Sequence, residues 1–190
     1  DVMAVLLLAE VLAGEVSIDQ TAKALTAAKA LGDVTVLCAS NGCNGAAQSL
    51  AKLEGVTKVL CAENTSYGNG FAEPISDLIV SISSNYEHII APATSLAKNI
   101  LPRVAALLDV MIISDITAIV DGNTFERPIY AGNAIQTVKS SDKLKVLSIR
   151  TAGFDASGEG DTAAIETLSP VSDPTLSVWV EDKVQASECY

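Results

Sequence analysis

Two turns in this sequence contain the glycines with which backbone amides could bind a phosphate or another anion. Residues 10–15, after the first predicted strand, have neither the GxGxxG spacing of dinucleotide-binding folds nor the lysine of a P-loop. The turn after the second strand, residues 41–45, places two glycines before a predicted helix, whose N-terminus can bind an anion. Glycine at such a position more often only permits the turn, so we assign it a structural role.

The histidine and the aspartates do not form a recognisable catalytic or metal-binding pattern. His88, the only histidine, opens a predicted buried strand without a spaced ligand partner, and a hydrolytic triad would also need a positioned nucleophile. Asp109, Asp115 and Asp121 fall at strand ends and turns, without the dense alternation of a calcium-binding loop. We therefore predict a structural histidine, no catalytic residue and no metal site.

The four cysteines, Cys38, Cys43, Cys61 and Cys189, lack CxxC spacing and have no companions placed for zinc. Their simplest interpretation is as reduced thiols in an intracellular compartment. Cys38 and Cys61 lie near the ends of predicted strands, where cysteine behaves as a small buried hydrophobic residue. Redox chemistry is the less favoured interpretation for both.

The charge balance argues against a nucleic-acid partner. Twelve basic and twenty-three acidic residues give a net charge of -11, which repels a phosphate backbone and leaves little counterion release to drive binding. The acidic residues cluster in 54–73 and 155–188. Such clusters favour a solvated face that keeps the protein soluble, and the alternative is a docking surface for a basic partner.

The hydrophobic residues indicate a globular α/β domain and no transmembrane segment. They make up 49% of the chain, and the mean hydropathy is positive, but apolar runs such as 2–9 and 88–93 are too short to span a bilayer. Aromatic residues make up only 4%. A core of Ala, Val, Leu and Ile is typical of buried parallel strands covered by helices.

Short apolar runs alternate with segments of helical periodicity through the first half of the chain, which predicts repeated βαβ units. Right-handed crossovers place such strands in one parallel sheet with helices on both faces. The first helix is capped at Ser17 or Asp19 and ends before Gly32. The predicted strands are 3–9, 34–39, 58–62 and 88–93, and the predicted helices are 17–31, 44–53, 73–84 and 95–108.

The pattern changes after Asp109. Two longer β segments, 112–120 and 124–138, flank Asp-Gly-Asn at 121–123, which suits a tight hairpin and predicts an antiparallel pair. The remaining predictions are a main-sheet strand at 143–150, a loop at 151–160 and an edge strand at 163–168. The predicted fold class is a three-layer, mostly parallel, doubly wound α/β sheet of the adenine nucleotide alpha hydrolase-like type, with an added antiparallel β segment.

The end of the chain has a different composition from the rest. Residues 178–187 mix acidic and basic side chains, as in an exposed helix, and Trp179 is their only large anchor. We predict an N-terminal α/β domain over residues 1–176 and a linker helix over residues 177–190 that leads toward a further domain.

Two segments carry polar side chains that suggest an interface or a structural role. Residues 99–109 predict a proline-containing helix with Arg103 on it. In residues 127–134, Arg127, Tyr130 and Asn133 surround a glycine, which in a β segment permits a bulge or a close backbone approach. Arg127 and Asn133 either satisfy buried carbonyls, which we favour, or bind a partner. For Tyr130 and Arg103 the interface role and the structural role both remain open.

Together with Ser114–Ile116 and Val146–Ala152, these two segments resemble the electron transfer flavoprotein α subunit family in order and spacing. The resemblance runs from about residue 5 to about residue 187 and is carried by several separated motifs. It implies that the chain is the N-terminal domain of such a subunit, without the C-terminal FAD-binding domain.

Several functional expectations follow from this resemblance. In that family the α and β subunits form a heterodimer that accepts electrons from dehydrogenases, as in fatty acid β-oxidation, and passes them to a membrane quinone oxidoreductase or a similar acceptor. The FAD that does this chemistry is held mostly by the second domain of the α subunit, and an AMP by the β subunit. No cofactor-binding residue is therefore expected in this chain. The implied compartment is the mitochondrial matrix in a eukaryote and the cytoplasm in a bacterium.

Two other classes of protein remain as alternatives. Related α/β folds bind adenine nucleotides at the carboxyl ends of their strands, so the chain could be a free-standing adenine-nucleotide-binding or hydrolase domain. This alternative needs a phosphate loop that the sequence does not supply. The other is a regulatory or interaction protein derived from the same family.

Overall fold

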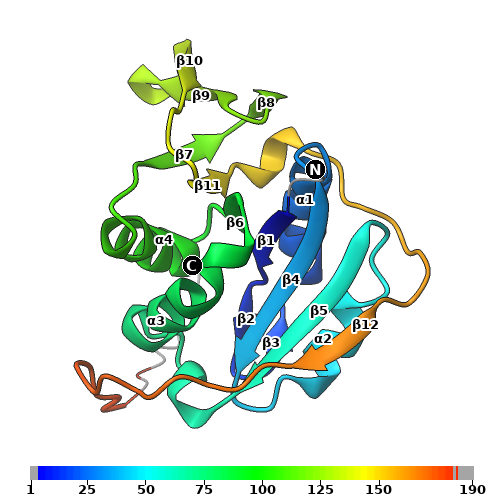
Figure 1. Cartoon of the computed structure of the whole chain (residues 1–190), viewed down its shortest axis with the longest axis vertical. Coiled ribbons are helices and arrows are strands. Elements are labelled where there is room, and N and C mark those ends of the chain that lie inside the picture. Colours follow the sequence, from blue (N-terminus) through cyan, green and yellow to red (C-terminus); the bar gives the residue numbers. More distant parts are fainter. Residues whose placement is uncertain (1–3, 182, 184–190) are drawn as a thin grey trace, which may run out of the picture.

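A seven-stranded parallel sheet forms the centre of the computed structural model, which describes residues 4–181 and 183 (Figure 1). All six neighbouring strand pairs are parallel, so the predicted fold class is confirmed. From one edge to the other the strands are β12 (Ala164–Thr167), β5 (Val56–Glu63), β4 (Asp33–Ser40), β1 (Ala4–Leu8), β6 (His88–Pro92), β11 (Lys145–Ile149) and β7 (Ile112–Ile116).

Helices cover both faces of this sheet, as the alternation of β and α segments predicts. Alternate residues of the central strand β1 enter two separate hydrophobic clusters: Val5 and Leu7 pack with α1 and α2, and Leu6 and Leu8 pack with α3 and α4. Burying each such side chain stabilises the fold by about 1.5–3 kcal/mol. The helices are α1 (Ile18–Lys29), α2 (Asn44–Leu50), α3 (Ala72–Ile82) and α4 (Ser95–Leu107).

A second, antiparallel sheet lies against the β7 edge of the main sheet (Figure 1). It has three strands instead of the predicted pair, in the order β10 (Ala134–Lys139), β9 (Thr124–Ile129) and β8 (Ala118–Asp121). The predicted hairpin turn at 121–123 is confirmed, and Asn123 N donates a hydrogen bond to Asp121 Oδ1 (2.8 Å).

The two long β segments predicted in this region are both interrupted, which corrects the sequence-based boundaries. The 112–120 segment divides into β7 and β8 because Asp115 has a φ of 58°, and the chain then leaves the main sheet. The 124–138 segment divides because residues 130–132 all have positive φ and reverse the chain. Gly132 therefore belongs to a turn between β9 and β10 and not to a bulge.

The remaining short elements were not predicted. A two-stranded hairpin, β2 (Val11–Leu12) and β3 (Glu15–Val16), follows β1. Single turns of 3₁₀-helix occur at η1 (Thr65–Tyr67), η2 (Ser83–Asn85), η3 (Tyr130–Gly132) and η4 (Thr151–Gly153). Within the described residues, no helix combines the length and the hydropathy needed to cross a membrane.

The segment after β12 runs in an irregular, open conformation past η1 and α3 (Figure 1). Val171 N donates to Tyr67 Oη (3.1 Å), and Ser177 Oγ donates to Glu73 Oε1 (2.8 Å). The predicted linker helix is wrong for 177–181, which are not helical; residues 182 and 184–190 lie outside the described residues. Val178 and Val180 are largely exposed, so this segment lacks the buried apolar face that stabilises a short helix.

Cys43 and Cys61 form a disulfide, which corrects the prediction of reduced thiols for these two residues. Cys43 immediately precedes α2, and Cys61 lies in the neighbouring strand β5, so the fold brings their Cα atoms within 6.4 Å. Cys38 remains a buried thiol, and burial raises its pKa to about 12. At neutral pH this thiol is therefore protonated and a poor nucleophile.

We expect the disulfide to stabilise the fold by closing a loop between residues 18 positions apart. Replacing Cys43→Ala should lower the free energy of unfolding by about 3 kcal/mol, because the unfolded chain regains the entropy of that loop. Urea denaturation would measure the loss, and a reducing agent should destabilise the wild type by a similar amount but leave the variant unchanged. Recovery of Cys43 and Cys61 as separate thiol peptides after alkylation without reductant would contradict the assignment.

Candidate functional site

Three of the four predicted site residues lie on the small antiparallel sheet. Arg127 is on β9, and Tyr130 and Asn133 flank the turn between β9 and β10. Arg103 is elsewhere, on α4. The structure thus brings three of them to one region and separates the fourth.

Arg127 links the small sheet to the main sheet. Its Nη2 donates to Ser114 Oγ on β7 (3.1 Å), while its buried Nε has no hydrogen-bond partner among the described residues. An open cavity of about 370 Å³ beside Arg127 is lined mainly by the start of β7 and by residues of β10 and the loop that follows it. The hydrogen bond goes to a hydroxyl and not to a carbonyl, so the role that we favoured from the sequence stays a prediction.

The turn after β9 has a tight internal hydrogen-bond pattern. Asn133 uses both its backbone N and its Nδ2 to donate to Tyr130 O, at 3.1 and 2.9 Å. The side chain of Asn133 is thus a turn-stabilising group. Tyr130 has a φ of 50° and is 79% exposed, so its ring contributes little to the core and is available to a partner.

Arg103 lies near a contact between α3 and the C-terminal segment. The pKa of the Glu73 carboxyl is lowered by a hydrogen bond from the backbone N–H of Glu73 and by one from Ser177. The nearby positive charge of Arg103 lowers it further. The Arg103 Nε is buried without a partner among the described residues. Arg103 therefore lies close to the place where Ser177 contacts α3.

His88 fixes the other end of the small sheet. The His88 ring is fully buried, its Nε2 lies 2.7 Å from Gly122 O in the β8–β9 turn, and it packs edge-on against Phe125 at 6.5 Å between ring centroids. Because Gly122 O can only accept, the ring donates from Nε2. Burial lowers the pKa of His88, which keeps it neutral in this structural role.

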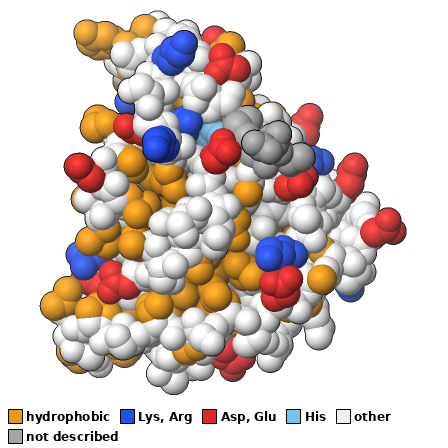
Figure 2. All heavy atoms as spheres, in the orientation of Figure 1, with side chains coloured by type: hydrophobic (Ala, Val, Ile, Leu, Met, Phe, Trp, Pro, Cys, Tyr) orange, Lys and Arg blue, Asp and Glu red, His pale blue; other side chains and the backbone are white. Residues whose placement is uncertain are grey.

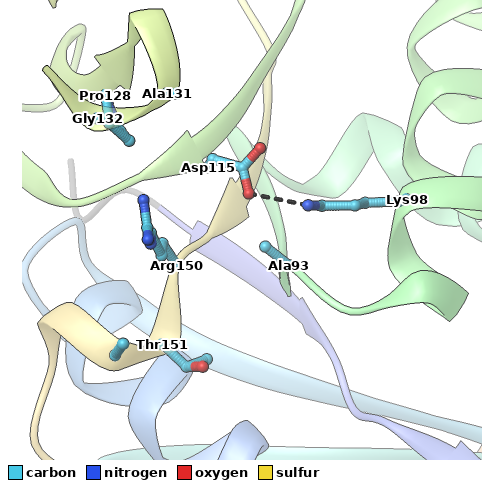
Figure 3. Close-up of a pocket in the computed structure, with 9 residues that line it drawn as sticks. Ala93, Lys98, Asp115, Pro128, Ala131, Gly132, Arg150 and Thr151 are labelled. Atoms are coloured by element: carbon cyan, nitrogen blue, oxygen red, sulfur yellow. Dashed lines mark ion pairs between the residues drawn. The ribbon is translucent and has the colours of Figure 1, made fainter. Parts of the chain in front are cut away.

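A polar cavity of about 530 Å³ opens where β6, β11 and β7 end and the β9–β10 turn folds over them (Figure 3). Three charged side chains line it. Lys98 Nζ on α4 and Asp115 Oδ1 on β7 form an ion pair at 3.1 Å, and Arg150 follows the last residue of β11. In Figure 3 the Arg150 guanidinium points toward the turn that contains Ala131 and Gly132.

Sequence analysis did not assign these three charged residues to a binding site. The sequence groups Asp115 only with Asp109 and Asp121, whose spacing does not match a calcium-binding loop. The described residues contain no group of three or more His, Cys, Asp or Glu side chains that could hold a metal ion. Asp115 and Arg150 do lie within Ser114–Ile116 and Val146–Ala152, two segments that carry the family resemblance. The family resemblance of these two segments indicates that Asp115 and Arg150 matter, but the sequence does not show that they lie close together. The fold shows this.

The crevice where doubly wound sheets usually bind nucleotides is closed. The strand order reverses between β1 and β6, so a ligand would enter at their carboxyl ends. There the gap encloses no volume that a water molecule could occupy. Its lining consists of Leu8, Ala9, Glu10, Ala91, Pro92, Leu96 and Ala97.

These features define a three-layer, doubly wound α/β domain with a polar cavity where β6, β11 and β7 end, next to the closed crevice between β1 and β6. The sequence profile of the electron transfer flavoprotein domain matches residues 5–173, and the chain belongs to that family. This confirms the resemblance predicted from the separated motifs.

Curated relatives support the same assignment. The chain is 59% identical over 186 residues to the electron transfer flavoprotein subunit alpha of Paracoccus denitrificans, a match that covers 98% of this chain and 60% of the relative. It is 48% identical to the subunit alpha of Pseudomonas aeruginosa, covering 88% of this chain and 55% of the relative. It is 40% identical to a mitochondrial electron transfer flavoprotein subunit alpha of Dictyostelium discoideum, covering 90% of this chain and 53% of the relative. The chain thus spans between half and about 60% of their length.

The buried histidine should make stability depend on pH. Because the folded-state pKa of His88 is below its ordinary value of 6.5, the unfolded chain binds a proton that the folded chain does not. The free energy of unfolding should be constant above about pH 7 and fall below pH 6.5 by up to about 1.4 kcal/mol per pH unit. Urea denaturation at a series of pH values would measure this.

A His88→Gln variant is the matched control, since the amide can still donate to Gly122 O. Its stability should be nearly constant between about pH 7 and 5. Glu73 and Asp121, whose pKa values are also lowered, titrate at lower pH and affect both proteins equally. An unchanged pH dependence in His88→Gln would show that His88 is not the group responsible.

Proposed function

We propose that this chain is the N-terminal scaffold domain of an electron transfer flavoprotein α subunit. In this role it supports FAD-mediated electron transfer by assembling with a β subunit and with the FAD-binding domain, and carries no electrons itself. The electron donors would be dehydrogenases and the acceptor a quinone oxidoreductase. The compartment would be the mitochondrial matrix or the bacterial cytoplasm, depending on the source.

The observation that carries this proposal is the family match across residues 5–173 together with the partial coverage of the relatives. Relatives named as subunit alpha extend well beyond the matched part, which leaves room in them for a further domain. The segment that follows β12 remains in contact with α3 as far as Ser177. The boundary that we propose between domain and linker, at residues 176 and 177, therefore lies at that contact.

The closed crevice between β1 and β6 favours a scaffold over an adenine-nucleotide-binding domain. A nucleotide there would have to displace Leu8 and Leu96, two apolar side chains that line the gap. The turns after β1 and β4 also lack a phosphate-loop pattern. On the face shown in Figure 2, acidic and basic side chains are interspersed around apolar ones, as on a surface suited to protein contacts.

We expect the purified chain to bind neither FAD nor AMP on its own. After incubation with excess FAD and removal of the unbound cofactor, its absorbance spectrum should show no flavin bands, and calorimetry with AMP and ATP should show no saturable heat. If the chain retained one FAD per molecule, the proposal that another domain binds the FAD would be contradicted. Saturable AMP binding that persists in an Arg150→Gln variant would instead favour the free-standing nucleotide-binding domain.

Tyr130 provides a test of the proposed assembly. Because its ring is exposed and aromatic residues often dominate protein interfaces, Tyr130→Asn in the full-length α subunit should weaken association with the β subunit by about 10-fold or more. Asparagine tolerates the left-handed backbone at this position, so the melting temperature should not change. Analytical ultracentrifugation would measure the dissociation constant.

The control for this experiment is Ile165→Thr, which removes a partly exposed apolar side chain from β12, at the opposite edge of the main sheet. It should leave association unchanged. Equal dissociation constants for wild type and Tyr130→Asn would place the interface elsewhere. Absence of any complex between the wild-type full-length α subunit and the β subunit would overturn the scaffold proposal itself.

A further inference from the structure

We propose that the cavity between the β9–β10 turn and the carboxyl ends of β11 and β7 binds a small organic anion, whose carboxylate or phosphate group is held by the guanidinium of Arg150. This inference does not rest on the proposed function, because it concerns a ligand of this domain alone.

The charge in the cavity has the opposite sign to that of the protein. The whole chain has a net charge of -11, yet the cavity is lined by two cations and one anion, Lys98, Arg150 and Asp115. Asp115 is paired with Lys98 at 3.1 Å. Arg150 is exposed and takes part in none of the four ion pairs among the described residues, so its positive charge remains open to a ligand.

Local backbone structure holds this arrangement in place. Ser114 and Asp115 together lie opposite the single residue Ser148 of β11, a bulge of the kind that re-aims a side chain out of the strand pattern. Asp115 N donates to Ser148 Oγ (2.9 Å), and Arg150 N donates to Ile116 O (2.9 Å). The backbone at the base of both charged side chains is therefore fixed.

Unfavourable backbone conformations gather around the same cavity. Asp115 and Ala131 line it, Tyr130 adjoins it, and these three non-glycine residues have φ between 50° and 58°. Such conformations are costly for residues with a β-carbon and are concentrated at functional sites in proteins. Here they place the turn directly above Arg150 (Figure 3).

The chemistry of the lining selects the class of ligand. A guanidinium presents a planar fork of donors that matches the two oxygens of a carboxylate or phosphate group. The lining also includes the small apolar side chains of Ala93, Pro128 and Ala152, which can contact the carbon part of such a molecule. A volume of about 530 Å³ exceeds what an inorganic ion needs and suits a small metabolite.

The test is a titration of the isotopically labelled chain with sodium acetate and, separately, with inorganic phosphate, at constant ionic strength adjusted with sodium chloride. The backbone amide resonances of Gly132 and Thr151, which line the cavity, should shift in a saturable manner with at least one of the two probes. The probe that binds more tightly identifies the ligand as a carboxylate or as a phosphate compound.

Two variants should move the affinity in opposite directions. Arg150→Gln should weaken binding by about 10-fold or more, because the fork of donors and its charge are lost. Asp115→Asn should tighten binding several-fold, because it frees Lys98 while asparagine keeps the left-handed conformation. Lys58→Gln, which removes a cation paired with Glu166 at the far edge of the sheet, should change nothing.

The amide spectrum of each variant reports whether it is folded, and Arg150→Lys serves as a second variant that keeps the charge but loses the fork. The proposal is overturned if neither probe shifts the cavity amides of the wild type. It is equally overturned if folded Arg150→Gln and Arg150→Lys bind as tightly as the wild type, or if Asp115→Asn weakens binding. FAD and β-subunit association, measured separately, decide the scaffold proposal and not this one.

Discussion

The burial of both faces of β1 is the constraint on which the rest of this domain depends. Val5, Leu6 and Leu7 are completely buried, and they point alternately into two hydrophobic clusters on opposite sides of the sheet. Neither cluster can exclude water unless helices cover it, so the chain must cross from face to face between parallel strands. The carboxyl ends of all the parallel strands then point in the same direction, and the connecting loops meet at that end of the sheet.

Among the residues that the structure describes, β7 is the last strand of the main sheet, and the small antiparallel sheet covers this region. Phe125 extends the hydrophobic cluster beneath it, and the contacts of His88 with Gly122 and of Arg127 with Ser114 join the two sheets through buried or half-buried polar groups. Because these two hydrogen bonds form only when both sheets are formed, the added sheet behaves as part of the domain and not as a flexible arm.

Local pattern was enough to predict the central sheet, because the strands there are short apolar runs bounded by turns and the helices between them have a regular apolar face. It failed where backbone conformation and not hydrophobicity decides the structure. Ile112–Val120 and Thr124–Val138 have continuous β-forming composition, and nothing in that composition reveals left-handed backbone at Asp115, Tyr130 and Ala131. The Cys43–Cys61 disulfide and the convergence of Lys98, Asp115 and Arg150 depend on which strands become neighbours, which spacing along the chain does not specify.

The position of the polar cavity follows from the same constraint that closes the usual crevice. At the reversal point between β1 and β6, two fully buried strands meet, and Leu8 and Leu96 fill the gap because an empty space there would cost packing energy on both sides. β7 is the edge strand, so the bulge at Asp115 and the turn at residues 130–132 can be accommodated there without opening the core. Polar groups that would be too costly at the centre are therefore tolerated at this edge, where solvent and the Lys98–Asp115 pair compensate their charge. The domain in this way keeps a closed central core and still presents a charged concave surface beside it.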